Sequence, residues 1–186
     1  MRGRFILLII LLGCFLNAYA AEIGSVSMPD LLETEQGVLI LNGAGIRTKF
    51  SLSVYVAGLY LHHKNVNFEQ IIAADEPMAI RLQVTSALIT AQIMAQATRE
   101  GFVKATGGDI NPIRPETETF IEIFSDKIHK NDVFELIYIP AKGVTAYKNK
   151  KIFTVIKGLP FKQALFGIWL CDNPVQQDLK NAMLGR

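Results

Sequence analysis

The strongest constraint on the fold of this chain is a series of strand-like segments separated by turn residues. In Met78–Thr85, the apolar residues Ile80, Leu82 and Val84 alternate with polar ones, and this period of two is typical of a strand with one buried face. Lys148–Lys151 lies between two more apolar segments and indicates a hairpin turn. The other strands that we expect are Val38–Leu41 (ending at a turn over Asn42–Gly45), Arg47–His62, Asp132–Ile139, Val144–Tyr147 and Ile152–Ile156.

Helical patterns are fewer, and they lie between and after these strands. A short helix over Phe68–Ala74 has Asn67 in the N-cap position. Apolar residues at four-residue spacing indicate a long helix from Ser86 to about Ala105. Strands in succession with separate helices predict an α+β fold, an antiparallel sheet covered by a helical layer. The remaining helices that we expect are Glu116–Phe124, Phe161–Cys171 and Val175–Leu184.

The first twenty residues resemble a secretory signal peptide. Arg2 and Arg4 precede the apolar run Phe5–Leu12, and Ala18–Ala20 forms a cleavage pattern of small residues. The run is well short of the roughly 20 apolar residues that a membrane span needs. We therefore expect cleavage after Ala20, a periplasmic or secreted location, and one mature domain over residues 21–186 with no transmembrane span. Leu11–Cys14 also resembles a lipoprotein cleavage box, which leaves lipidation of Cys14 as the alternative.

Without this leader, the chain is electrically balanced. Loss of Arg2 and Arg4 leaves 17 basic and 17 acidic residues. Nucleic-acid binding is therefore not expected, because it needs a basic excess that displaces counterions from phosphates. Only Cys171 remains, so the mature chain has no intramolecular disulfide, and we expect this cysteine to be a small buried apolar residue.

General catalytic and metal-binding motifs do not occur in the sequence. Gly43–Gly45 begins like a dinucleotide-binding loop, but no third glycine follows in the required place. His62 and His63 are adjacent, so on a strand they point to opposite faces, and His129 has no metal-ligand spacing to either. We expect no metal and no cofactor.

Arg47 is the clearest candidate for a functional side chain. It follows a glycine-rich segment and begins a largely apolar one. A guanidinium beside an apolar core offers a fork of donors for a carboxylate or a polarised carbonyl. The alternative is an edge-strand arginine whose stem covers apolar surface while its head group stays hydrated.

Two segments around Arg47 resemble a known family. Asn42–Phe50 followed by Val54–Leu61 is similar to the N-terminal signature of chalcone isomerase-like proteins. Leu159–Phe161, Ile168–Leu170 and Pro174–Gly185 are similar to the C-terminal end of the exported bacterial branch of this family. The resemblance implies a large antiparallel sheet covered by helices, with a ligand cleft between them. The family includes isomerases, plant fatty-acid-binding proteins and many non-catalytic members.

The resemblance also implies candidate site residues. Arg47 and Tyr55 match the arginine and tyrosine that hold the ligand carboxylate in binding members, and Tyr60 matches the second tyrosine of the motif. The isomerases carry a tyrosine and an asparagine on the long helix, where this chain has Ile89 and Gln96. Loss of a donor to the reacting oxyanion can raise a barrier by about 3–4 kcal/mol. We therefore assign no catalytic residue.

The spacing of Arg47 and Tyr55 sets a condition on this site. Eight residues of one straight strand span about 26 Å, at roughly 3.3 Å per residue. The two side chains can share a ligand only if the chain bends within Thr48–Ser53 or if Arg47 lies on a preceding strand, and Lys49–Ser51 is the expected bend.

From these patterns we expect an exported, non-catalytic protein that binds a small amphipathic ligand, such as a fatty acid, in a cleft. The alternatives are an intramolecular lyase of the chalcone–flavanone isomerase type and a ligand-free partner protein of the cell envelope.

Overall fold

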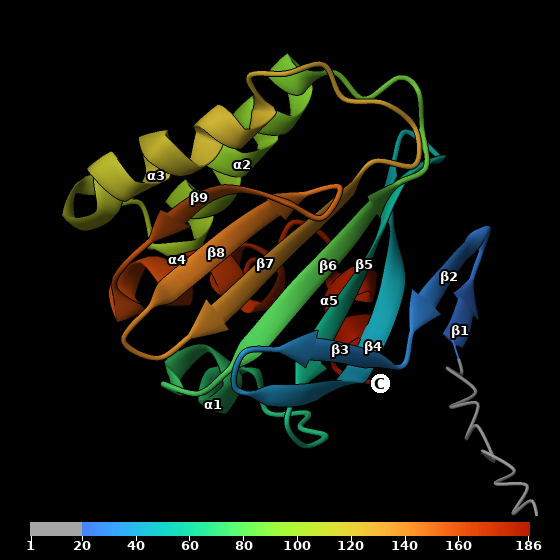
Figure 1. Ribbon diagram of the computed structural model, residues 1–186. Helices are drawn as coiled ribbons and strands as arrows, with labels where there is room; N and C mark the ends of the chain where they lie inside the picture. Colours follow the sequence, from blue (N-terminus) through green and yellow to red (C-terminus); the bar gives the residue numbers. More distant parts are fainter. Residues whose placement is uncertain (1–19) are drawn as a thin grey trace, which may run out of the picture.

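The computed structural model describes residues 20–186, so the predicted leader lies outside the described residues except for Ala20. Its centre is a seven-stranded antiparallel sheet in which each strand pairs with the next along the chain, in the order β3-β4-β5-β6-β7-β8-β9 (Figure 1). Most of the connections are short turns, whereas the one from β5 to β6 contains α1 and the long one from β6 to β7 contains α2 and α3. The strands are Leu31–Thr34 (β3), Gly37–Lys49 (β4), Leu52–Leu61 (β5), Met78–Val84 (β6), Val133–Ile139 (β7), Gly143–Lys148 (β8) and Lys151–Ile156 (β9).

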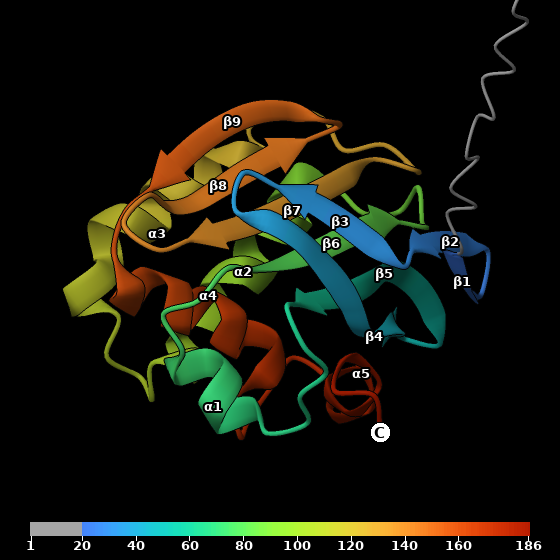
Figure 2. The same ribbon diagram turned by 60° about the horizontal axis from the view of Figure 1, so that its bottom comes forward.

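Helices cover one face of this curled sheet (Figure 2). This arrangement confirms the α+β prediction of an antiparallel sheet under a helical layer. The helices are Phe68–Ala73 (α1), Ala91–Ala105 (α2), Arg114–Ile121 (α3), Leu159–Leu170 (α4) and Gln177–Met183 (α5), with 3-10 turns at Asn111–Ile113 and Glu122–Phe124.

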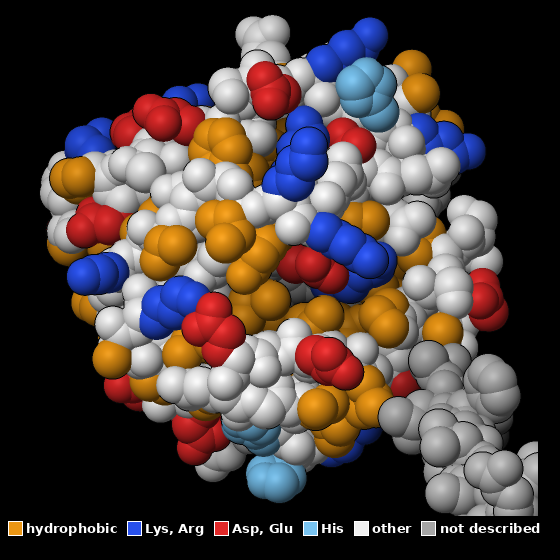
Figure 3. Space-filling view, in the orientation of Figure 1, with side chains coloured by type: hydrophobic (Ala, Val, Ile, Leu, Met, Phe, Trp, Pro, Cys, Tyr) orange, Lys and Arg blue, Asp and Glu red, His pale blue; other side chains and the backbone are white. Residues whose placement is uncertain are grey.

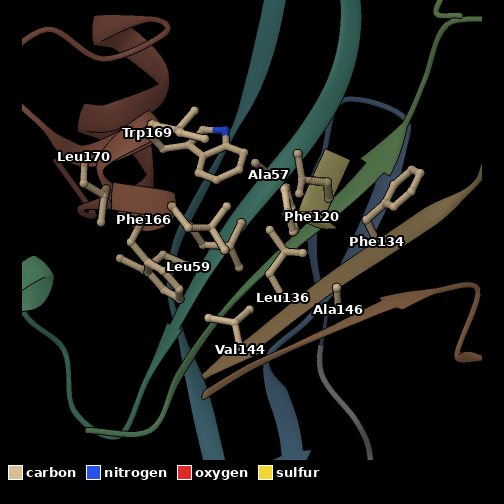
Figure 4. Packing of buried hydrophobic residues seen from close by; sticks show 14 of the residues in the cluster. Ala57, Leu59, Phe120, Phe134, Leu136, Val144, Ala146, Phe166, Trp169 and Leu170 are labelled. Atoms are coloured by element: carbon tan, nitrogen blue, oxygen red, sulfur yellow. The ribbon is translucent and has the colours of Figure 1, made fainter. Parts of the chain in front are cut away.

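The main hydrophobic core lies between the helices and the sheet. Trp169, Phe166 and Leu170 of α4 pack over inward-facing side chains of the strands, including Leu59 and Leu136 (Figure 4). At one end of this core, phenylalanine rings from α2, α3, the 3-10 turn after α3, α4 and β7 pack against one another with centroids 5.6–6.1 Å apart. These rings belong to Phe102, Phe120, Phe124, Phe134 and Phe161.

The other face of the sheet is partly covered as well. The hairpin of Ala20–Ile23 (β1) and Val26–Pro29 (β2) forms a separate two-stranded sheet, and β2 contributes Val26 and Met28 to a second core. This second core also contains Leu39, Val56 and Tyr60. The short strands β1, β2 and β3 were not predicted from the sequence.

The predicted single strand Arg47–His62 is wrong, because the chain turns at Phe50 and Ser51. Both residues have positive φ, +50° and +62°, and they form a two-residue hairpin loop between the paired residues Lys49 and Leu52. Mirror-image turns of this kind match the twist of paired strands. The bend that the site requires therefore exists, at the position expected for it.

The predicted turn over Asn42–Gly45 is also wrong: the segment continues β4, with a register shift between Leu41 and Gly43. The two glycines allow helix α5 to approach the backbone of β4 closely. A Cβ on Gly43 would lie 2.2 Å from the Ala182 carbonyl oxygen, and one on Gly45 would lie 2.6 Å from the Ala182 Cβ. They let α5 pack directly on the strand.

The long helix begins later than predicted. Ser86 accepts a hydrogen bond from the Leu88 N–H and so shapes a turn, whereas Thr90 accepts from the Ile93 N–H at 3.2 Å and caps α2. The helix expected over Glu116–Phe124 begins earlier, at Arg114, and its last three residues form a 3-10 turn. The short helix after Asn67 is confirmed, because the Asn67 side chain accepts from the Gln70 N–H.

Candidate functional site

Arg47 and Tyr55 lie directly opposite each other on β4 and β5. Cross-strand partners have Cα atoms about 4.5–5.5 Å apart, so the hairpin brings together two residues that a straight strand would separate by about 26 Å. Tyr55 belongs to the core under the helices. Arg47 therefore points to the same, helix-covered face.

The Arg47 side chain is half-buried and is held by one residue from the other end of the sequence. Its Nη1 donates to Gln176 Oε1 at 3.0 Å and to the Thr48 carbonyl at 2.7 Å. The same Gln176 oxygen accepts from the Thr48 N–H at 2.9 Å. Gln176 stands just before α5, so the docking of α5 on the glycines of β4 also positions the guanidinium.

Tyr55 is buried, and its hydroxyl oxygen accepts a hydrogen bond from Trp169 Nε1 at 3.1 Å. Burial raises the pKa of Tyr55 above its usual value, while the Trp169 hydrogen bond and the nearby charge of Arg47 partly offset this rise. The phenol therefore stays neutral at physiological pH. For this hydroxyl proton, the structure of residues 20–186 records no acceptor, so Tyr55 is able to donate to a ligand.

A small cavity of about 70 Å³ lies over these residues. Among the described residues that line it, Arg47 and Lys49 are charged and none is acidic. The apolar wall comes from β5, the segment before α2, and helices α2 and α4, and includes Val54, Ile89, Ile93, Met94, Ile168 and Trp169.

A second, smaller cavity adjoins the first. It measures about 20 Å³ and shares Met94, Thr98 and Trp169 with its neighbour. Its other walls are the phenylalanines Phe120, Phe124 and Phe134 with Leu82, Ile123 and Leu136. Met94, Thr98 and Trp169 thus lie between the cavity at Arg47 and an aromatic one deeper in the core.

Tyr60 is not part of this arrangement. It lies five residues after Tyr55 on the same strand, so it points to the opposite face of the sheet. There it is fully buried in the second core, and its hydroxyl donates to the Pro29 carbonyl at 2.8 Å. Burial raises the pKa of Tyr60 well above its usual range. The structure thus brings together Arg47 and Tyr55 but leaves Tyr60 on the far side, where it anchors β2.

The sequence profile of a family described as chalcone isomerase-like matches residues 20–185. The chain belongs to the chalcone isomerase-like family. The same fold occurs in the crystal structure of a fatty-acid binding protein from Arabidopsis thaliana, with a TM-score of 0.66 and 17% sequence identity. That likeness covers 86% of this chain and 91% of the Arabidopsis chain. No curated protein sequence matches this chain.

In this chalcone isomerase-like chain, the two positions matched to catalytic residues provide no donor to the cavity. Ile89 precedes α2 and presents an apolar side chain to the cavity wall. Gln96 is exposed on α2, and its Nε2 donates to Glu100 Oε1 at 3.0 Å. The polar groups that face the cavity therefore include the Arg47 guanidinium and the Tyr55 hydroxyl, and neither matched position adds to them.

Sequence reasoning missed two residues of the site, Trp169 and Gln176. Trp169 lies in a helix that is apolar almost all round, so its indole N–H gave no sign of a specific partner. Gln176 is an ordinary polar residue before a short helix, 129 positions from Arg47. Only a contact map could have linked either residue to the Arg47–Tyr55 pair.

Within residues 20–186, no group of three or more His, Cys, Asp or Glu side chains is arranged to hold a metal ion. Over the same residues, no helix has both the length and the apolar character to cross a membrane. Cys171, predicted to be buried, is half-buried at the end of α4.

Proposed function

We propose that this protein binds a small amphipathic carboxylate, with a fatty acid as the leading candidate, between the sheet and helices α2 and α4. The observation that carries the proposal is the cross-strand pair of Arg47 and Tyr55 at an apolar cavity. The Arg47 guanidinium and the neutral Tyr55 phenol line the same cavity and can donate hydrogen bonds to both oxygens of a carboxylate. The absence of acidic residues among the described lining favours an anion over a cation.

The acyl chain would run from Arg47 towards the phenylalanine cluster. This path passes Met94 and Trp169, which both cavities share. The space present, about 70 Å³ and 20 Å³, is below the roughly 300 Å³ of a common ligand pocket. A long acyl chain therefore requires the two cavities to open into one.

Helix α2 is the element best suited to this opening. Of its 15 residues, only Met94, Gly101 and Phe102 are buried, and Met94 is the only one of the three in the first two turns. Methionine is unbranched and adapts its shape at low cost. Rotation of Met94, with a small outward shift of the first turns of α2, would join the cavities without disturbing the sheet.

The shared fold with a known protein supports this ligand class. The Arabidopsis protein of the same fold is described as a fatty-acid binding protein. The intramolecular lyase alternative is less well supported, because Ile89 offers no hydroxyl where the resemblance places the tyrosine of the isomerases. The ligand-free alternative predicts a filled core, whereas this core contains two cavities beside a half-buried Arg47.

The chain provides its own probe for the test. Trp169 is its single tryptophan and lines both cavities. Titration with a long-chain fatty acid should change the tryptophan fluorescence, and calorimetry should give the affinity. A charge-assisted hydrogen bond contributes roughly 1.5–3 kcal/mol, so Arg47→Ala should weaken binding about ten- to a hundredfold. Tyr55→Phe should have a smaller effect, since it removes one neutral hydroxyl and keeps the ring.

The matched control is Arg114→Ala. Arg114 is exposed at the start of α3 and is not among the cavity residues. This variant should bind the fatty acid like the wild type. Equal affinity of wild type and Arg47→Ala would contradict the proposal.

A further inference from the structure

Exposed apolar side chains lie on or beside the segments that line the Arg47 cavity. Phe50 is 89% exposed, Leu88 66%, Leu52 51% and Ile93 40%. We call these four residues the mouth collar. Ile93 itself lines the cavity, as do Lys49 and Ile89. Phe50 directly follows Lys49 in the sequence, and Leu88 directly precedes Ile89.

Hydrogen bonds join the β4–β5 hairpin to the segment before α2, and these two segments contain Phe50, Leu52 and Leu88 of the collar. Ser53 and Thr85 are linked through their hydroxyl oxygens at 3.1 Å, and the Thr85 N–H donates to the Val54 carbonyl at 3.0 Å. The β4–β5 turn and the segment before α2 therefore form one continuous rim. Figure 1 shows both at the same end of the molecule, at the upper right of the view.

Phe50 occupies an unfavourable position for a residue of its type. Two-residue turns with positive φ at both positions favour Asn-Gly, yet this turn is Phe50-Ser51. A bulky side chain with φ of +50° is strained, and exposure of 89% means that packing within this chain does not repay the strain. A strained apolar side chain that projects into water points to a contact outside the chain.

The charges around the collar are basic. Residues 47–53 and 85–93 contain Arg47 and Lys49 and no acidic residue. The Lys49 ammonium lies 5.7 Å from the Phe50 ring centroid. The next loop is balanced in charge, with Lys127 and Lys130 against Asp126 and Asp132, and it is joined to the rim because the Asn131 N–H donates to the Val84 carbonyl. In Figure 3, hydrophobic and basic side chains lie side by side at this end of the molecule.

We propose that the mouth collar docks on an anionic lipid bilayer, so that the cavity receives its ligand directly from the membrane. Apolar side chains that enter the interface, together with lysines that attract anionic head groups, are the two contributions that hold a protein on such a surface. Four collar residues are far fewer than the 20–30 residues per side of a stable protein interface, which disfavours a second copy of this chain as the occupant. The docking step stands on the collar alone; the ligand delivery rests on the proposed function.

The test is co-sedimentation of the purified protein with vesicles that contain no added fatty acid. Vesicles of phosphatidylcholine and phosphatidylglycerol in equal parts should retain the protein, and vesicles of phosphatidylcholine alone should retain it much less. The double variant Phe50→Asn/Leu88→Ser should reduce the apparent affinity at least about tenfold, because it removes two large apolar side chains that would enter the bilayer. Asparagine tolerates a positive φ, so this variant should unfold no more easily than the wild type.

The matched control is Ile152→Ser/Phe153→Ser on the edge strand β9. These side chains are 63% and 40% exposed but belong to neither cavity, so vesicle binding should be unchanged. Docking by the collar is overturned if the protein does not bind the anionic vesicles, if both vesicle types bind equally, or if both double variants lose binding alike. It is also overturned if sedimentation velocity shows a dimer that Phe50→Asn dissociates. If instead fatty-acid calorimetry fails while collar-dependent vesicle binding persists, the proposed function falls and the docking stands.

Discussion

At the residue scale, Arg47 is held by a neutral side chain that a ligand must share or replace. Gln176 Oε1 accepts from both Arg47 Nη1 and the Thr48 N–H, and its Nε2 donates to the Ile46 carbonyl at 3.3 Å. A neutral amide orients the guanidinium but leaves its charge uncompensated. The site thus keeps an oriented positive charge, which is what a carboxylate ligand needs.

Gln176→Glu tests this account with almost no change of shape. The new carboxylate would pair with Arg47 and compete with a bound anion, so fatty-acid affinity should fall about tenfold or more. Stability should change little, because the new ion pair with Arg47 offsets the loss of the hydrogen bond from Nε2 to the Ile46 carbonyl. Calorimetry and urea unfolding at neutral pH measure the two effects. Unchanged affinity would show that the ligand does not use the Arg47 charge.

At the element scale, the short helix α1 depends on a lysine from α4. Lys162 is fully buried, and its Nζ donates to the carbonyls of Ile71, Ile72 and Ala74 at 3.0, 2.9 and 2.6 Å. These are carbonyls at the C-terminal end of α1, which has no basic residue of its own in its last turn. Burial lowers the pKa of Lys162 to about 8, although Asp75 and Glu76 oppose the change.

Lys162→Met should therefore lower the free energy of unfolding by about 3 kcal/mol, because it leaves three carbonyls, one buried and two partly buried, without their donor. The exposed Lys157, just before α4, is the matched control, and Lys157→Met should change stability by less than about 0.5 kcal/mol. Urea unfolding measures both. Equal stability of the two variants would mean that solvent satisfies the end of α1 as well as Lys162 does.

Asp132 plays a comparable part where β7 begins. Its carboxylate accepts from Asn149 Nδ2 and from the His129 N–H, both at 2.9 Å, with Lys148 Nζ 3.8 Å away. Burial alone would raise the pKa of Asp132, but these hydrogen bonds and the lysine charge outweigh it, so the pKa is lowered. The carboxylate thus joins the loop before β7 to the β8–β9 turn.

Because the folded pKa of Asp132 lies below the unfolded value of about 3.9, the stabilisation is present at neutral pH and is lost as the pH falls through the folded pKa. Asp132→Asn should lower the free energy of unfolding by about 2 kcal/mol at pH 7. The difference from wild type should shrink in strong acid. Urea unfolding at both pH values checks this, and a difference that does not depend on pH would contradict it.

At the scale of the whole molecule, the prediction that extends furthest beyond the described residues is export. The tripartite leader ends at Ala20, and β1 begins at the same residue, so cleavage there would leave Ala21–Ile23 to pair with β2. N-terminal sequencing of protein from the cell envelope should begin Ala21-Glu22-Ile23. Protein in the cytosol with Met1 retained would contradict export, and lipid on Cys14 would establish the lipoprotein alternative.

Much of the architecture was predictable because it depends on local patterns. The alternation in β6, the hairpin turn at Lys148–Lys151 and the cap at Asn67 each involve residues within a few positions of one another. The family resemblance supplied the Arg47–Tyr55 pair, and strand length set the condition that the chain bends between them or that Arg47 lies on a preceding strand. Local physical chemistry sufficed for these features because backbone geometry limits what such short patterns can form.

Tertiary structure alone decided the rest. Gly43 and Gly45 suggested a turn, yet both belong to a strand. Their lack of side chains leaves the space in which α5 packs. Strand alternation places Tyr60 and Tyr55 on opposite faces of the sheet. Only the tertiary structure shows that Tyr60 is buried in a second core under β2. Trp169 and Gln176 reach the site from the C-terminal helices. These outcomes follow from which face of the sheet each helix covers, and that choice is set by packing between segments more than a hundred residues apart.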